Sequence, residues 1–312
     1  MCLSARTLFR SSLLLGVSLV AGVLTPQRAD AQRERLVVRL DQLGATSVVQ
    51  PAGTVAPARF DQQALQVTLS HRLVRDQGSA IVILGGQWRA VRQPLPRRAA
   101  AVGGSTGGAT GGTAEGTTTL HTATADLMLL RTVGERHTVV GVLRPGFYGN
   151  ALRVEGAAFV DRIVSPRTTI GAGLSYASTF GQLLPIPVVH VVSRASRRVL
   201  IDALLPARAD VWYMPRKGLD VGVNASLAGA LYGLTDSQST TQGVTGANAV
   251  GVANATVGPQ VRWTPKGGKW QLTADAGTTV LRRAEYVRDG RVLADLAPGN
   301  VPYVRLGLQR LF

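Results

Sequence analysis

The sequence has few of the residues on which soluble exported proteins and enzymes usually depend. Its 312 residues include one cysteine, and aromatic residues make up 5%. That cysteine, Cys2, lies in a segment that we expect to be removed, so no disulfide is predicted in the mature chain. Beyond residue 31 no apolar run reaches ~18 residues, which excludes a transmembrane helix. A soluble domain of this size would normally use more aromatic residues in its core.

Motifs for catalysis, metals and nucleotides are also missing. The four histidines, His71, His121, His137 and His190, do not stand at helical metal-ligand spacing. The glycine-rich segments lack the Lys-Ser/Thr of a phosphate-binding loop and the third glycine of a dinucleotide site. No Gly-x-Ser-x-Gly element is present. We therefore expect no cofactor, no metal and no enzymatic activity; a hydrolase at a barrel rim, using His121, is a remote alternative.

The first 31 residues have the features of a cleaved secretory signal peptide. Arg6 and Arg10 precede an apolar run at 13–24, and Ala29, Asp30 and Ala31 form an A-x-A cleavage site. The predicted organisation is therefore a signal peptide at 1–31, for the general secretory route, and one domain at 32–312.

Apolar and polar residues alternate with period two through most of that domain. In the clearest example, Leu219, Val221 and Val223 alternate with Asp220 and Asn224. About fourteen such strands can be counted, with twelve as the alternative, and none of the intervening segments has a helical period. The connections are alternately short and long, and the segment 93–119, rich in Gly and Thr, reads as a long mobile outer loop. These features predict an all-β, antiparallel up-and-down transmembrane barrel with both termini in the periplasm.

The last strand supports this interpretation. Tyr303, Leu306, Leu308 and the terminal Phe312 resemble the closing strand of bacterial outer-membrane barrels, which implies that they form the signal read by the barrel assembly machinery. The aromatic residues also gather near predicted strand ends, as in the two interfacial girdles of such barrels. The expected inner group is Trp263, Trp270, Tyr213 and Phe312, and the expected outer group is Trp88, Phe147, Tyr148, Phe180, Tyr232 and Tyr286.

The segment 168–234 resembles a known family. It contains the runs LPIPV at 184–188, VLIDALLP at 199–206 and ADVWY at 209–213. These are similar to an uncharacterised family of bacterial outer-membrane barrels, catalogued as a domain of unknown function. The resemblance implies a porin-like barrel in the outer membrane of a Gram-negative bacterium, and it implies no catalytic or binding residue.

Strand parity places a set of polar and charged side chains on the inner face. Charged side chains must point inward because Arg or Lys at the lipid midplane costs ~2–4 kcal/mol. The expected pore-lining residues are Asp126, Arg153, Glu155, Asp161, Asp220, Asn224 and Asp275.

The formal net charge of +16 fits phosphate-rich lipid and lipopolysaccharide as partners better than nucleic acid, which an exported chain rarely meets. We expect a porin-like passive channel for small solutes, in which Arg97, Arg98, Arg144 and Arg153 favour anions. A closed structural or adhesion barrel, whose outer loops bind partners, is the alternative. The sequence fixes neither the solute nor the oligomeric state.

Overall fold

The computed structural model describes residues 34–47, 59–73, 80–94, 117–241, 244 and 246–311. Almost all of these residues are in strands. The elements are β1 (Glu34–Ser47), β2 (Arg59–Leu73), β3 (Ala80–Pro94), β4 (Thr117–Val133), β5 (His137–Tyr148), β6 (Ala151–Ser165), β7 (Thr168–Ala177), β8 (Leu184–Ser193), β9 (Val199–Leu205), β10 (Arg208–Arg216), β11 (Leu219–Gly233), α1 (Asp236–Thr241), β12 (Ala249–Trp263), β13 (Trp270–Arg288), β14 (Arg291–Leu296) and β15 (Pro302–Leu311). No helix in this part of the chain is long and apolar enough to cross a bilayer.

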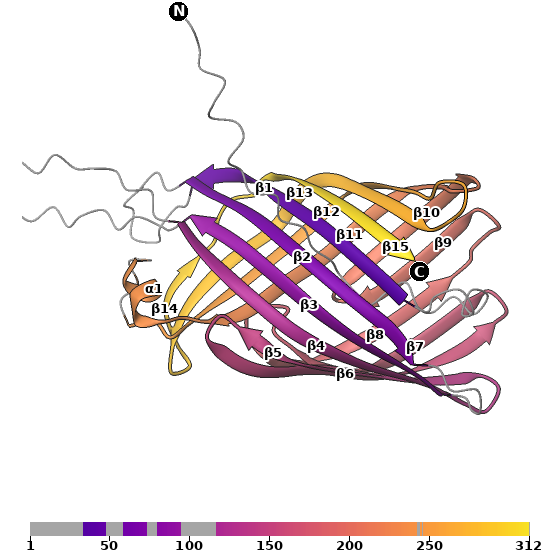
Figure 1. Cartoon of the computed structure of the whole chain (residues 1–312), viewed down its shortest axis with the longest axis horizontal. Helices are drawn as coiled ribbons and strands as arrows, with labels where there is room; N and C mark the ends of the chain where they lie inside the picture. The colour runs from indigo at the N-terminus through magenta and orange to yellow at the C-terminus, as the bar shows by residue number, and fades with distance from the viewer. Residues whose placement is uncertain are drawn as a thin grey trace, which may run out of the picture.

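The strands form one closed antiparallel barrel (Figure 1). Each strand from β1 to β13 pairs with the next, β13 pairs with β15, and β15 returns to β1. Within the described ranges β14 pairs only with β13, so fourteen strands make the wall. The predicted fold class is confirmed, including the strand count. The seam joins residues far apart in the chain, because Arg35 on β1 lies opposite Leu311 on β15.

The wall is apolar outside and mixed inside. On β4, Thr122, Thr124 and Asp126 are buried on the inner face, whereas Ala123 and Leu127 are exposed on the outer face. On β11 the side chain of Val223 is 53% exposed, whereas Asn224 is 7% exposed. A soluble sandwich would show the opposite burial, so the exposed apolar surface is a lipid-facing surface.

The start of β1 and the end of β15 lie at the same end of the barrel, with the short turns 134–136, 166–167, 194–198, 217–218 and 264–269. We refer to this as the inner end, at the right of Figure 1. Exposed Trp263, Trp270 and Tyr213 lie near this end, as predicted for an inner girdle.

At the outer end, the structure differs from the prediction for three aromatic residues and for two loops. Phe147 and Phe180 are exposed, but Tyr148, Tyr232 and Tyr286 are at most 3% exposed and face inward instead of joining a girdle. The predicted loop 235–248 contains α1, and the predicted loop 288–300 contains β14. The ends of the predicted loop 93–119 belong to β3 and β4, and residues 95–116 lie outside the described residues.

The orientation of the wall predicts the effect of a charge on its outer face. Val223 lies four residues above Leu219 at the inner girdle, which is ~10 Å into an apolar band ~25 Å tall, so Val223→Arg should lower the free energy of unfolding in phospholipid vesicles by ~2–4 kcal/mol. Val164→Arg is the control, because Val164 is equally exposed but lies beside an inner turn, where the cost should be ~0–1 kcal/mol. Equal losses for the two variants would contradict a lipid-facing wall.

Candidate functional site

The predicted interior residues that the structure describes all lie on the inner face of the wall, and most of them form ion pairs. About halfway along β4 and β5, Arg144 Nε donates to Asp126 Oδ1 at 2.6 Å. Beside this pair, Glu155 accepts a hydrogen bond from the backbone N–H of Ser178 at 3.0 Å and another from the Ser178 hydroxyl. Arg153 precedes Glu155 on the same face of β6, where it lies opposite Gly146 of β5.

A second group spans the seam. Arg305 Nε lies 3.0 Å from Asp41 Oδ1, and Arg305 Nη1 lies 3.2 Å from Asp275 Oδ1. Arg39 Nε contacts the same oxygen of Asp41 at 3.0 Å. The register of β1, β15 and β13 brings these charged side chains together, since Arg305 lies directly opposite both Asp41 and Asp275.

Further groups lie on the wall from β6 to β12. His190 Nδ1 lies 2.8 Å from Asp161 Oδ1, with both side chains buried. Asp210 accepts hydrogen bonds from the amides of Asn224 and Gln260, each at 2.8 Å. Two arginine–aspartate pairs complete the set: Arg208 with Asp202 at 2.8 Å, and Arg262 with Asp220 at 2.7 Å. Ion pairs therefore occur in the interior from near the inner end to about halfway along the barrel.

Part of the interior is apolar, on strands that also carry Asp126, Arg144 and Asp161, and parity reasoning missed it. Met128, Leu130, Val140 and Phe159 form a buried cluster on β4 to β6, and Ile81, Ile83, Val142 and Leu204 pack against it. On β8 the inward side chains include Ile186 and Val188, each less than 9% exposed. The sequence carried one signal of this arrangement: both faces of β8 are apolar except for His190, so alternation could not show which face was inside.

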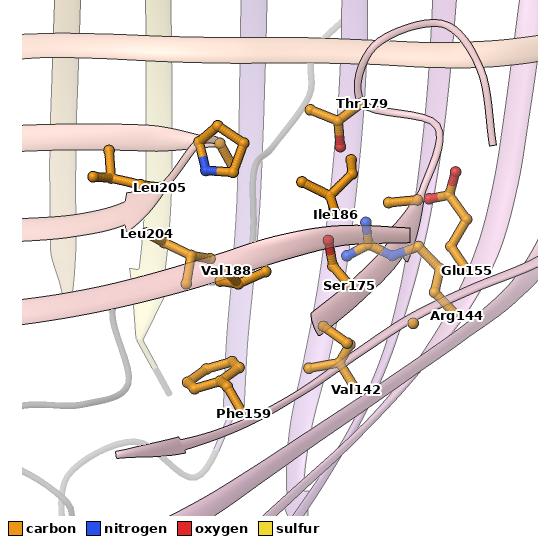
Figure 2. A pocket seen from close by; sticks show the side chains of 15 residues that line it. Val142, Arg144, Glu155, Phe159, Ser175, Thr179, Ile186, Val188, Leu204 and Leu205 are labelled. Carbon is orange, nitrogen blue, oxygen red and sulfur yellow. The ribbon is translucent and has the colours of Figure 1, made fainter. Parts of the chain in front are cut away.

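A cavity of about 180 Å³ lies in this apolar part of the interior (Figure 2). Val142, Phe159, Ile186, Val188 and Leu204 line most of it. Figure 2 shows Leu205 and Leu204 at one side of the cavity and Arg144 and Glu155 at the other. The cavity thus joins the apolar part of the interior to the Asp126–Arg144 pair and Glu155.

The outer end of the barrel is closed by the ends of β11, β12 and β13. Their inner face carries Ala230, Tyr232, Val250, Val252, Ala284 and Tyr286, which pack in one buried cluster with Ala64, Val91, Leu120 and Tyr148 of the opposite wall. We call these ends of β11–β13, with α1 and β14, the lid. Figure 1 shows α1 and β14 at the outer end, near β5.

Two connections of the wall hold the other face of the lid. The β5–β6 turn reaches Gly233 through a bridge from Gly149, and Asn150 Nδ2 donates to the Leu234 carbonyl at 3.0 Å. The β7–β8 connection covers Gly229 and Gly251, where an added Cβ would collide with the carbonyl oxygens of Thr179 and Gly181, respectively. Glycines at these positions therefore permit close approach of the two backbones.

The remaining predicted residues are placed as follows. Tyr303 faces inward beside Leu43 and Val301, whereas Leu306 is half-exposed on the lipid face. Phe312 lies outside the described residues, so the assembly signal stays a prediction. His121 is exposed on the outer face beside Trp88, away from the buried Asp126. Among the described residues, no group of three or more His, Cys, Asp or Glu side chains could hold a metal ion.

Buried ion pairs of this kind are sensitive to the loss of one partner. Removing one member of a buried pair typically costs ~3–5 kcal/mol, because the other charge is left unpaired, whereas replacing both members costs much less. We therefore expect Asp126→Asn to destabilise the protein more than the double variant Asp126→Asn/Arg144→Gln. Unfolding titrations of both single variants and the double variant give the coupling; additive losses would contradict a paired arrangement.

No protein-family profile matches the chain, and no curated protein is similar to it in sequence. The resemblance of the segment 168–234 to an uncharacterised family is therefore without support from a family match. The local structure gives a physical reason for the prolines in those runs, since Pro185 and Pro187 lie on a half-paired strand and Pro206 lies in a tight turn.

Comparison with solved structures finds barrels of low similarity. An outer membrane channel from Pseudomonas putida F1 is 11% identical, with coverage of 90% of this chain and 96% of that chain, and a TM-score of 0.45. The Pseudomonas putida toluene transporter TodX is 9% identical over 91% of both chains, with a TM-score of 0.39. The translocator domain of the autotransporter NalP from Neisseria meningitidis is 11% identical over 91% and 90%, with a TM-score of 0.31. Scores below 0.5 carry no weight here, and the fold rests on the strand pairing itself.

Proposed function

We propose that the protein is a passive channel for small solutes in the outer membrane of a Gram-negative bacterium, with a lid that closes its outer mouth at rest. The carrying observation is the series of ion pairs along the interior, from Asp220–Arg262 near the inner end to Asp126–Arg144 about halfway along the barrel. Charged groups inside a membrane are costly, and they usually mark a route for solutes or ions.

Apolar side chains could fill the same space without any buried charge that needs a partner. Replacing buried ion pairs with apolar residues is often neutral or stabilising, so stability alone does not account for so many pairs. A polar lining, by contrast, is what a hydrated path requires. The ion pairs thus favour a conducting interior over an inert one.

The charges inside give little support to a preference for anions. Arg144 is paired with Asp126, and Arg305 is shared between Asp41 and Asp275. Arg97 and Arg98 lie outside the described residues. In the proposed channel, solutes are therefore selected by their size and not by their charge, and the lid controls their access.

The tight packing of the lid is the one observation that specifically favours the alternative, a closed structural or adhesion barrel. Tyr232, Tyr286 and Val250 are at most 2% exposed where the lid meets the wall. A permanently closed barrel and a gated channel would look the same in this resting state. Opening the lid separates them.

Gly251→Val should favour opening of the lid by releasing it from the β7–β8 connection that holds it, because the new side chain would collide with the Gly181 carbonyl of that connection. Gly141→Val is the matched control, since a Cβ added at Gly141 meets no atom within 4 Å. In a liposome-swelling assay with small neutral solutes, we expect slow swelling for the unmodified protein and the control, and several-fold faster swelling for Gly251→Val. Heat-modifiable migration on gels checks that each variant is folded.

The absence of swelling with a folded, lid-opened variant would overturn the proposed channel. Trypsin cleavage within the segment 234–248 gives an independent measure of lid opening, since Leu234 and Ala247 are buried in the closed state. If cleavage rises and swelling does not, the interior is closed below the lid and the structural barrel becomes the better account.

A further inference from the structure

Two wall strands lose a neighbour in the outer half of the barrel. The β9–β10 hairpin turns at 206–207, well below the outer ends of the strands on either side. β8 pairs with β9 only over the part from Val189 to Ser193, and β10 reaches β11 only as far as Ser226. Within the described residues, no strand fills the space between 184–188 of β8 and the part of β11 from Leu227 to Gly229, where the β7–β8 connection reaches β11.

The unpaired edge of β8 carries two prolines. Pro185 and Pro187 both lie above the last residue that pairs with β9, and both are exposed. The register with β7 continues through both of them, so the N–H groups that proline lacks would have pointed toward the opening. An unpaired N–H in hydrocarbon costs several kcal/mol, and proline removes it. The sequence is therefore suited to an opening at this place.

The opening is a bounded window in the wall. The β9–β10 turn at 205–207 forms its lower edge. The β7–β8 connection closes its upper edge by resting on Gly229 and Gly251 of the lid. This connection is fixed at two points, by the Ser178 N–H to Glu155 at 3.0 Å and by Gln182 Nε2 to Glu285 Oε2 at 2.7 Å.

The window lies at the level of the outer leaflet. Leu219 at the inner end of β11 pairs with the girdle residue Trp263, and Leu227 lies eight residues further along the strand. At ~3.3 Å per residue and a tilt of ~40°, this places the lower edge roughly 20 Å above the inner girdle. The apolar band of such barrels is ~25 Å tall. The exposed Tyr176, opposite Pro185, marks the outer interface beside the top of the window.

The 180 Å³ cavity lies directly behind this window. Its lining includes Leu205, Pro206 and Ala207 of the lower edge and Thr179 of the upper edge. The remaining lining is mainly apolar, and Val142, Phe159 and Leu204 continue into the apolar cluster that extends toward the inner end. A path of apolar contacts thus leads from the lipid-facing surface into the interior without passing the lid.

We infer that this window is a side portal through which small apolar molecules dissolved in the outer leaflet reach the interior, with the cavity as their first binding site. This inference rests on the proposed channel function, for which it names the solute class and the route. A dry apolar cavity of ~150 Å³ holds one benzene molecule, so the cavity suits an apolar molecule with a single ring. Arg144 and Glu155 are engaged by Asp126 and Ser178, and the ligand requires no charge of its own.

Binding is tested with fluorobenzene and the full-length refolded protein in lipid nanodiscs, observed by ¹⁹F NMR against empty nanodiscs. We expect saturable binding that Ala157→Trp weakens about tenfold or more by filling the cavity. Ala158→Trp is the matched control: Ala158 is the next residue of β6, exposed on the lipid face, and its replacement should leave binding unchanged. Ser175→Phe provides a second filling variant if Ala157→Trp does not fold. No saturable binding to the unmodified protein would overturn the solute class.

The route is tested at the lower edge of the window. Leu205→Trp should slow the exchange of fluorobenzene between bilayer and site several-fold in both directions and change the Kd much less than Ala157→Trp does, because Leu205 is 46% exposed at the rim where the cavity meets the portal. Leu174→Trp, on the lipid face of β7, should leave the exchange rate unchanged. If binding persists and Leu205→Trp leaves the rate unchanged, the portal is wrong. Both readouts are independent of swelling by neutral polar solutes, so failure of this inference and failure of the channel are distinguishable.

Discussion

The structure depends on one constraint, the need of every backbone N–H and C=O in hydrocarbon for a partner. With no water available, strands crossing a bilayer must close on themselves. The chain achieves this through the pairings of β12 with β13 and of β15 with β1. Where β9 and β10 are too short to continue the wall, the neighbouring strands meet the same requirement differently. β8 has prolines in place of N–H groups, and β11 bends inward to pack with the opposite wall.

The interior combines charged and apolar surfaces. Ion pairs such as Arg305 with Asp41 and Asp275 lie at the seam, whereas Phe159, Val140 and their neighbours form an apolar cluster on β4 to β6, which also carry the Asp126–Arg144 pair. Neither surface alone would distinguish a channel from a filled barrel. Their arrangement, with the cavity between Arg144 and Leu205, gives apolar and polar molecules separate surfaces along one lumen. The lid acts on the axial opening, whereas the side opening lies below it.

The period-two pattern sufficed to predict the barrel, because inside and outside differ in polarity along most strands. Asp126 and Asn224 are buried on the inner face of the wall, and the strand count of fourteen is confirmed. The same rule could not identify the apolar part of the interior, because Ile186 and Val188 resemble lipid-facing residues. It also misassigned Tyr148, Tyr232 and Tyr286, because a strand's own pattern does not show that the opposite wall comes close enough to bury a ring. The window depends on where β9 and β10 end relative to β8 and β11. The residue pattern of a single strand does not predict these relative positions.

The seam has a consequence for biogenesis. It joins β1 to β15, so the first and last strands of the wall must find each other across nearly the whole described sequence. Contacts of such long sequence separation form late and slowly, because the intervening chain must first be ordered. Until then both seam strands present open edges on which another chain could pair. Ring closure is therefore the step at which this polypeptide is most exposed to aggregation, and a catalyst that holds the edge of β1 until β15 arrives would act where the kinetic risk is greatest.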